Sequence, residues 1–222
     1  MYIYDLNNRL ISETEAGVAT VYTYDANGNT LTVTKGGSLC HSYTYGLFGT
    51  QDSHTSDGVT YLSYTYRPDG LRHSIGGTVH LWDGANIVAD VKGSDVTVYF
   101  RGINLIYADE DGTKEYYHFN AHGDVIALTN ASGTKTNSYT YNAFGVEYNR
   151  DIWDENPFRY CGEYYDTVTD TIYLRARYYD SALGRFTQQD GWKFAKPEDP
   201  LSLNLYTYCW NNPTKRRWIL FS

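Results

Sequence analysis

Short segments in which aromatic or aliphatic residues alternate with smaller polar residues recur along the chain, and turn-forming residues separate them. In residues 21–24 (Val-Tyr-Thr-Tyr) the two tyrosines are two positions apart, so they share one face of a β-strand. Asp-Ala-Asn-Gly follows at 25–28, and residues 30–34 alternate again. Because Asn-Gly is a preferred hairpin turn, this pattern predicts a β-hairpin with Asn27-Gly28 at its tip and Gly28 at positive φ.

The same unit is repeated at a nearly constant interval. Its second aromatic residue recurs every 20 to 22 residues, with a lapse between 67 and 115, at Tyr4, Tyr24, Tyr45, Tyr66, Phe119 and Tyr141. A single hairpin is marginally stable, so we expect successive hairpins to pair in one curved antiparallel sheet with the tyrosines stacked on one face. In the lapse, residues 80–84 and 96–102 still have strand patterns. Any helix is expected to be short and to follow Asp190.

Composition supports an all-β fold and excludes several functions. The 222 residues include 24 Tyr and 20 Gly but only 1 Met, and aromatic and β-branched residues favour strands. A formal net charge of −8 argues against nucleic acid as a partner, since phosphate binding needs a basic surface. No apolar run approaches the ~20 residues of a membrane-spanning helix. The first residues lack the basic and apolar segments of a signal peptide.

An ordered set of motifs occupies the last third of the chain. They are Asn-Pro-Phe-Arg-Tyr-Cys-Gly-Glu-Tyr-Tyr-Asp at 156–166, Tyr-Leu-Arg-Ala-Arg-Tyr-Tyr-Asp at 173–180, Gly-Arg-Phe at 184–186, Asp-Pro-Leu-Ser-Leu-Asn-Leu-Tyr-Thr-Tyr at 199–208 and Asn-Asn-Pro at 211–213. Together with the repeats, these motifs resemble the Rhs family of YD-repeat proteins. That family includes bacterial wall-associated proteins, the C components of toxin complexes, and the teneurins.

The resemblance implies a domain organisation. Residues 1–155 would form the YD-repeat sheet, degenerate at 67–115, and residues 156–213 the less regular repeat-associated core. Residues 214–222 would be an atypical tail without a toxin domain. In the family, the repeats form a β-sheet that spirals into a hollow shell, the core plugs one end, and a variable toxin usually follows.

The resemblance also implies a function: a structural segment of an Rhs-type shell that encapsulates and delivers polymorphic toxins, secreted or on a bacterial cell surface. Roughly six repeats are too few to enclose a protein-sized cavity, so we expect either a fragment of a longer shell or a natural short form. The open sheet edges and the tyrosine face would then bind the rest of the parent shell or a second copy, near Tyr4 and Tyr24.

Two other functions stay open at this point. The many tyrosines could stack on sugar rings, which would make the chain a surface adhesion or carbohydrate-binding module. The third function is self-cleavage by an aspartyl-type core, for which the resemblance assigns Arg177 and Asp190. A strand over 172–178 would place Arg175 and Arg177 on one face. The family's scissile Asp-Pro-x-Gly-Leu motif is absent after Pro213, so we expect this pair to be a vestigial, structural ion pair.

Other candidate sites have simpler structural explanations, and we expect no cofactor and no metal. The acidic residues at 109–112 fit a hairpin turn better than a calcium loop. His118 and His122 have a helical metal-pair spacing, but Asn120 and Gly123 indicate a turn. The sequon at Asn130 also fits a turn. The three cysteines, Cys40, Cys161 and Cys209, show no metal-binding spacing and are expected to be reduced thiols.

Overall fold

The computed structural model describes residues 1–58 and 60–215, and most of this chain forms one antiparallel sheet. Its fifteen strands lie side by side in the order of the sequence, so each strand pairs with the one before it and the one after it. The strands are β1 (Tyr2–Tyr4), β2 (Leu10–Glu15), β3 (Val18–Tyr24), β4 (Thr30–Lys35), β5 (Ser38–Tyr45), β6 (Gln51–Ser56), β7 (Thr60–Tyr66), β8 (Arg72–Ile75), β9 (Thr78–Asp83), β10 (Asn86–Lys92), β11 (Asp95–Arg101), β12 (Leu105–Glu110), β13 (Thr113–Phe119), β14 (Val125–Thr129) and β15 (Lys135–Ser138).

The residue after the second tyrosine closes the turn at one end of each repeat. After Tyr24, the Asp25 N–H donates to the Asn29 carbonyl at 2.9 Å, and the Gly28 N–H donates to the Asp25 carbonyl at 3.1 Å. One carboxylate oxygen of Asp25 also accepts the N–H groups of Asn27 and Asn29. Gly28 has a φ of 82°, as predicted. An acceptor side chain therefore holds the loop in the copies that have Asp or Asn at this position. Gly46 and Arg67 take the same place in two other copies, where backbone bonds close the turn.

The turns at the opposite end of the strands are shorter. Gly36 and Gly37 connect β4 to β5, and both have positive φ, 58° and 87°. Asp111 and Gly112 connect β12 to β13, and their φ angles are also positive, 49° and 84°. Positive φ at both central residues is the geometry of a type I′ hairpin, whose twist matches that of the strands. The acidic segment at 109–112 is thus part of a hairpin.

The two tyrosines of each repeat have different environments on the same face. The first is exposed in the copy that begins the chain, at Tyr2, and is buried in the later copies, as Tyr22, Tyr43, Tyr64, Tyr117 and Tyr139. The second lies at the end of its strand and reaches the backbone of the preceding strand. The Tyr24 hydroxyl donates to the Leu10 carbonyl at 2.8 Å, and that of Tyr66 to the Gln51 carbonyl at 3.0 Å. These bonds link neighbouring strands at the end of the sheet where the turns after the second tyrosines lie.

The degenerate stretch at 67–115 keeps the architecture of the repeats. Strands β8 to β12 continue the sheet without interruption. Tyr99 is buried in place of a first tyrosine. Arg101 stands where the second tyrosine would be, and its Nε donates to the Ile87 carbonyl at 3.1 Å. The repeat therefore lapses in sequence but not in structure.

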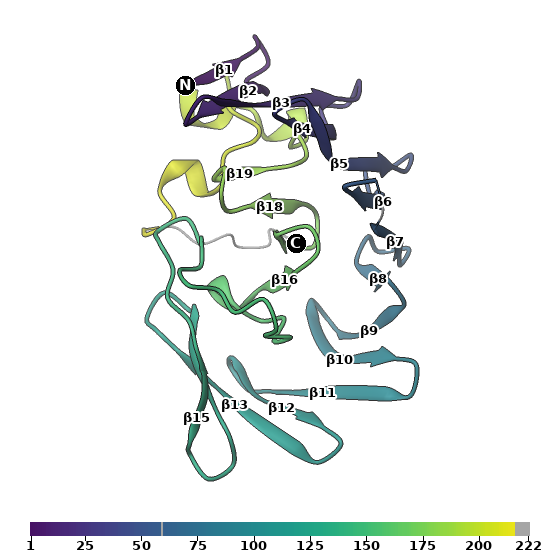
Figure 1. The fold of residues 1–222 in the computed structure, drawn as a ribbon, viewed down its shortest axis with the longest axis vertical. Helices are drawn as coiled ribbons and strands as arrows, with labels where there is room; N and C mark the ends of the chain where they lie inside the picture. The colour runs from purple at the N-terminus through teal and green to yellow at the C-terminus, as the bar shows by residue number, and fades with distance from the viewer. Residues whose placement is uncertain (59, 216–222) are drawn as a thin grey trace.

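Residues 156–213 fill the concave side of the sheet (Figure 1). They contain a four-stranded antiparallel sheet and four short 3₁₀ helices. These elements are β16 (Tyr164–Asp166), β17 (Thr171–Tyr173), β18 (Tyr178–Asp180), β19 (Arg185–Phe186), η1 (Tyr160–Gly162), η2 (Trp192–Phe194), η3 (Pro200–Leu203) and η4 (Cys209–Asn211). The helices are short, as expected, but η1 precedes Asp190, which the sequence did not indicate. A domain boundary near residue 155 stays a prediction.

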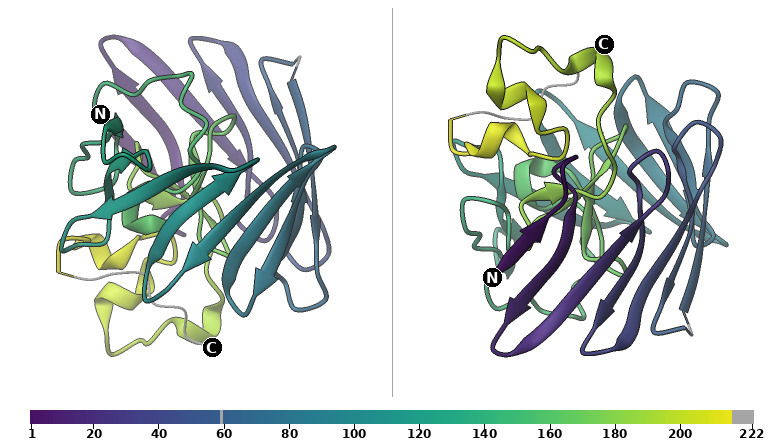
Figure 2. Two further views of the ribbon diagram at one scale, coloured as in Figure 1. Left: turned by 90° about the horizontal axis from the view of Figure 1, so that it is seen from below. Right: turned by 90° about the horizontal axis from the view of Figure 1, so that it is seen from above.

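Views from below and from above show the sheet wrapped around residues 156–213, the core segment (Figure 2). The Phe158 ring packs edge-on against Tyr99, with ring centroids 4.8 Å apart, and Tyr178 packs against Tyr64 at 5.8 Å. The amide of Asn156 accepts the Tyr117 hydroxyl at 2.6 Å and donates to that of Tyr139 at 3.1 Å. The expectation of an exposed tyrosine face is therefore wrong, because the core segment of the same chain covers it.

Candidate functional site

Arg177 and Asp190, the two positions implied by the family resemblance, form an ion pair. Arg177 lies just before β18, and its Nη2 is 2.8 Å from Oδ2 of Asp190. Its Nη1 donates to the Leu205 carbonyl at 3.2 Å, and its guanidinium carbon lies 3.7 Å from the centre of the Phe186 ring. The Arg177 side chain is 7% exposed and that of Asp190 is 27% exposed. The carboxylate is therefore the accessible member of the pair.

The expected strand over residues 172–178 is not formed. The chain turns at Arg175, whose φ is 58°, and β17 and β18 pair antiparallel with Tyr173 opposite Tyr178. Arg175 binds Glu163, whereas Arg177 binds Asp190, so the two arginines have separate partners. The strand prediction is wrong because a left-handed residue other than glycine leaves little trace in an alternating pattern.

The chemistry available to this pair is limited by its contacts. Burial lowers the pKa of Arg177 to about 10, against the opposing effect of the Asp190 carboxylate, so the guanidinium is charged at neutral pH. Oδ2 of Asp190 faces that guanidinium, and Oδ1 accepts the Gly191 N–H at 2.8 Å. A carboxylate in this position could transfer a proton to or from a peptide bond. Its use in catalysis stays a prediction.

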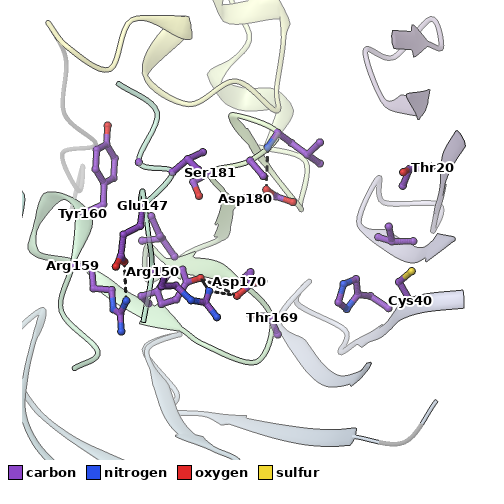
Figure 3. Close-up of a pocket in the computed structure, with 18 of the residues that line it drawn as sticks. Thr20, Cys40, Glu147, Arg150, Arg159, Tyr160, Thr169, Asp170, Asp180 and Ser181 are labelled. Carbon is purple, nitrogen blue, oxygen red and sulfur yellow. Dashed lines mark hydrogen bonds and ion pairs between the residues drawn. The ribbon is translucent and has the colours of Figure 1, made fainter. Parts of the chain in front are cut away.

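A second site is a cavity of about 520 Å³ between the sheet and the core segment (Figure 3). Strands β2 to β5 line one side, and residues 141–183 line the other. Charged groups from both sides reach it, including the buried Arg159–Glu147 ion pair at 2.7 Å. Burial raises the pKa of Asp180 to about 6, although the Leu183 and Ala182 N–H groups oppose this effect.

A buried charge network joins the sheet to the core segment, and no pattern in the sequence indicates it. Nη1 of Arg72 on β8 is 2.6 Å from Oδ2 of Asp166 on β16, and both side chains are almost completely buried. Nε of Arg72 donates to Nε2 of His80, whose Nδ1 contacts Asp90 at 2.6 Å. Burial lowers the pKa of Arg72, but the Asp166 carboxylate outweighs it and holds that pKa well above its usual value. This network fixes position rather than exposing a reactive group.

The remaining candidates are placed as follows. His118 is exposed on β13 and contacts Thr129, so it does not pair with His122. Asn130 accepts backbone N–H groups of the turn after β14. All three cysteines lie in the described part of the chain, and none of them forms a disulfide there. However, Sγ of Cys161 lies 3.8 Å from Nδ1 of His122. The spacing of these two residues in the sequence did not indicate this contact.

The buried tyrosines bear on the carbohydrate hypothesis. A sugar ring stacks on an aromatic face that solvent can reach, whereas Tyr64, Tyr117 and Tyr139 are packed in apolar clusters. Tyr22 and Tyr43 instead line the cavity of Figure 3. Carbohydrate binding stays a prediction. Among the described residues, no helix is long and apolar enough to cross a membrane.

The architecture of this site, with a repeat sheet curved around its own core segment, defines the class of YD-repeat β-shells. A family model of the teneurin YD-shell matches residues 87–214, and one of the RHS repeat matches residues 4–38. The first match spans more than half of the chain, so the chain belongs to the teneurin YD-shell family.

Individual relatives agree with this assignment. The tRNA nuclease WapA of Bacillus subtilis (strain 168) is 32% identical over 93% of this chain and 11% of its own length. Human teneurin-4 is 31% identical over 41% of this chain and 3% of its own length. This chain thus spans about a tenth or less of these proteins.

Solved structures show the same fold at low identity. The Tc holotoxin pore of Photorhabdus luminescens superimposes with a TM-score of 0.60 and 14% identity, covering 98% of this chain and 15% of that chain. A complex of TcdB2 with TccC3 superimposes with a TM-score of 0.59 and 16% identity over 96% of this chain and 15% of that chain.

Proposed function

We propose that this chain is a wall segment and core of a protein shell that encloses a toxin and delivers it outside the producing cell. The observation that carries the proposal is the open fifteen-stranded sheet with its core segment on the concave side. A sheet built from sequential hairpins can be extended at β1 by further repeats of the same kind. The names of the WapA relatives support a nuclease toxin as one type of cargo.

The core segment would close the shell at this end. It is held on the tyrosine face by contacts along the whole sheet, from Tyr206 at the first repeats to Asn156 at the last. The Tyr206 hydroxyl donates to the Gly28 carbonyl at 2.7 Å, and the Arg72–Asp166 ion pair lies between these ends. Such a plug moves only if several buried polar contacts break together, which suits a closed container.

The test uses the genomic coding region that contains this chain, expressed as one polypeptide. We expect repeats continuous with β1 and, after residue 222, a domain that resists protease while the shell is folded. The matched control is that domain expressed alone, which protease should degrade faster. Equal degradation rates in the two forms, or the absence of adjoining repeats, would contradict the proposal.

Self-cleavage is a second candidate function, because Arg177 and Asp190 form an ion pair at the positions that the family resemblance assigns. We propose that this pair is structural in the chain as it stands. Both oxygens of the carboxylate have donors, and the guanidinium lies over the Phe186 ring while its Nη2 donates to Asp190. The mass measurement described in the Discussion tests this proposal.

A further inference from the structure

Three potential metal-ligating side chains from two distant segments meet at one point. His122 and Asp124 lie in the turn between β13 and β14, and Cys161 lies in η1. One ligand atom of each lies within 4.8 Å of the others. Nδ1 of His122 is 2.8 Å from Oδ1 of Asp124 and 3.8 Å from Sγ of Cys161.

The contacts of His122 leave its Nδ1 facing the other two ligand atoms. Its Nε2 lies 2.8 Å from the Pro213 carbonyl, which can only accept, so the N–H of the ring is directed at that carbonyl. In this tautomer Nδ1 has the lone pair that a metal ion binds. An ion beside Nδ1 would contact the Asp124 oxygen and the Cys161 sulfur as well, because the three atoms lie within 4.8 Å of one another.

We propose that His122, Asp124 and Cys161 bind a divalent transition-metal ion of the zinc type through Nδ1, Oδ1 and Sγ. Imidazole nitrogen, carboxylate oxygen and thiolate sulfur are the donors that zinc takes in proteins. A histidine–aspartate contact alone involves two side chains, whereas here a cysteine sulfur also lies 3.8 Å from the same Nδ1. The His122 side chain is 22% exposed, so an ion can enter from solvent and a water molecule can complete the coordination.

The surrounding contacts orient the three ligands as supporting groups do around zinc. The Pro213 carbonyl fixes the tautomer of His122. The Asn120 amide donates to Oδ2 of Asp124 at 2.8 Å, and the Cys161 N–H donates to Oδ1 at 2.9 Å. These bonds hold the carboxylate with one oxygen toward the cysteine and the histidine.

The Cys161 thiol has to lose its proton when an ion binds. Burial raises the pKa of Cys161 to about 12. The negative charges of Asp124 and Glu163 raise this pKa further, whereas a hydrogen bond to Tyr208 lowers it. Without metal the side chain is a thiol. On binding, the ion forms a bond to Sγ and the thiol proton leaves to solvent, so the charge at the site rises by one. The same negative groups that disfavour the thiolate attract the ion.

The experiment is a titration of the full, untagged, reduced chain with Co²⁺ after removal of metal by a chelator. We expect one equivalent to bind with a thiolate-to-cobalt charge-transfer band, and Zn²⁺ to abolish the band and raise the melting temperature. Cys161→Ser and His122→Ala should each remove the band. Cys40→Ser and His118→Ala, which lie elsewhere, should keep it.

The outcome is decisive in either direction. A folded wild-type chain without the band, or a band that survives Cys161→Ser, would overturn the proposal. If the Cys161 and His122 variants fail to fold, alkylation of the wild type replaces them. Zn²⁺ should then slow alkylation of Cys161 and leave Cys40 unchanged, and equal effects on the two thiols would refute the site.

Discussion

Single charged residues carry much of the attachment between the sheet and the core segment. Arg72 and Asp166 are 94 residues apart in sequence, and their side chains are 0% and 1% exposed. A fully buried ion pair stabilises a protein little more than a pair of apolar side chains of similar volume would. Removing one partner is costly, however, because it leaves the other charge buried and unpaired. Such a pair specifies where the core segment docks, because only one position satisfies both charges.

Asp180 makes the stability of the fold depend on pH. Its pKa is about 6 in the folded chain, above the ordinary value of 3.8, because burial favours the neutral acid. The folded state therefore binds the proton more tightly than the unfolded state does. The stabilisation from this proton is complete below pH ~4 and is lost as pH rises through ~6.

We therefore predict that Asp180→Asn stabilises the chain at pH 7 relative to the wild type, and that the difference disappears near pH 4. The substituted amide keeps an oxygen to accept the Leu183 N–H, which is 3.0 Å away in the wild type. Urea unfolding at both pH values measures the difference. A stability difference that does not change between pH 4 and pH 7 would contradict the assignment.

At the scale of elements, the turns explain why the repeat needs glycine at a fixed offset. Gly28 and Gly49 occupy equivalent turns, with φ of 82° and 74°. An alanine at either position is strained by ~1–2 kcal/mol, because a Cβ is unfavourable in the left-handed region. Only at Gly28 would that Cβ also collide with the core segment, at the Gln189 side-chain oxygen and at the Tyr206 hydroxyl.

Gly28→Ala should consequently destabilise the chain more than Gly49→Ala, by an additional ~1–3 kcal/mol from overpacking. Gly49 is the matched control because no atom lies within 4 Å of its added Cβ. Chemical denaturation of both variants gives the comparison. Equal losses would mean that the repeat containing Tyr24 does not contact the core segment as described.

The elements that could be predicted from the sequence are those set by neighbouring residues. The hairpins follow from alternation and from Asp or Asn beside glycine, so the all-β sheet and the Gly28 turn are confirmed. The turn at Arg175 and the docking of the core segment on the tyrosine face were missed. Both depend on contacts between residues far apart in sequence, such as Tyr178 with Tyr64, which a periodic pattern does not contain.

The candidate site was predictable only through the family motifs. They brought Arg177 and Asp190 together, which the structure places in one ion pair. They did not indicate that His122 and Cys161 meet, because the two residues belong to a repeat turn and to the core segment. His122 and Cys161 are 39 residues apart in the sequence, and this separation matches no metal-binding motif. Their contact forms only when the core segment packs on the sheet.

For the whole molecule, the first expectation concerns its chemical integrity. The purified chain should keep the mass of its full sequence for days at neutral and mildly acidic pH, because both oxygens of the Asp190 carboxylate have donors. The scissile motif of the family is also missing after Pro213. Intact-mass spectrometry measures this. Loss of a defined C-terminal peptide in the wild type but not in Asp190→Asn would instead establish self-cleavage.

The second expectation concerns association, and the exposed edge of the sheet is its basis. Strand β1 pairs with β2 only, so its other edge has no partner strand among the described residues. The side chains of this strand are solvent-exposed, with Tyr2 at 62% and Ile3 at 45%. An unprotected apolar edge strand pairs readily with another chain. The core segment covers the tyrosine face, and the other edge strand, β15, contains only polar residues and begins with Lys135, which disfavours pairing. The β1 edge is therefore the surface that we expect to bind a second copy.

The purified chain should accordingly form dimers or larger oligomers at micromolar concentration, measured by light scattering. Ile3→Lys should shift the population toward the 25.4 kDa monomer, because a charged residue on an edge strand disfavours strand pairing. Leu47→Lys is the control, since Leu47 is fully exposed in the loop between β5 and β6 and lies away from the edge. A wild-type monomer, or equal dissociation by the two lysines, would show that β1 is not the surface through which copies associate.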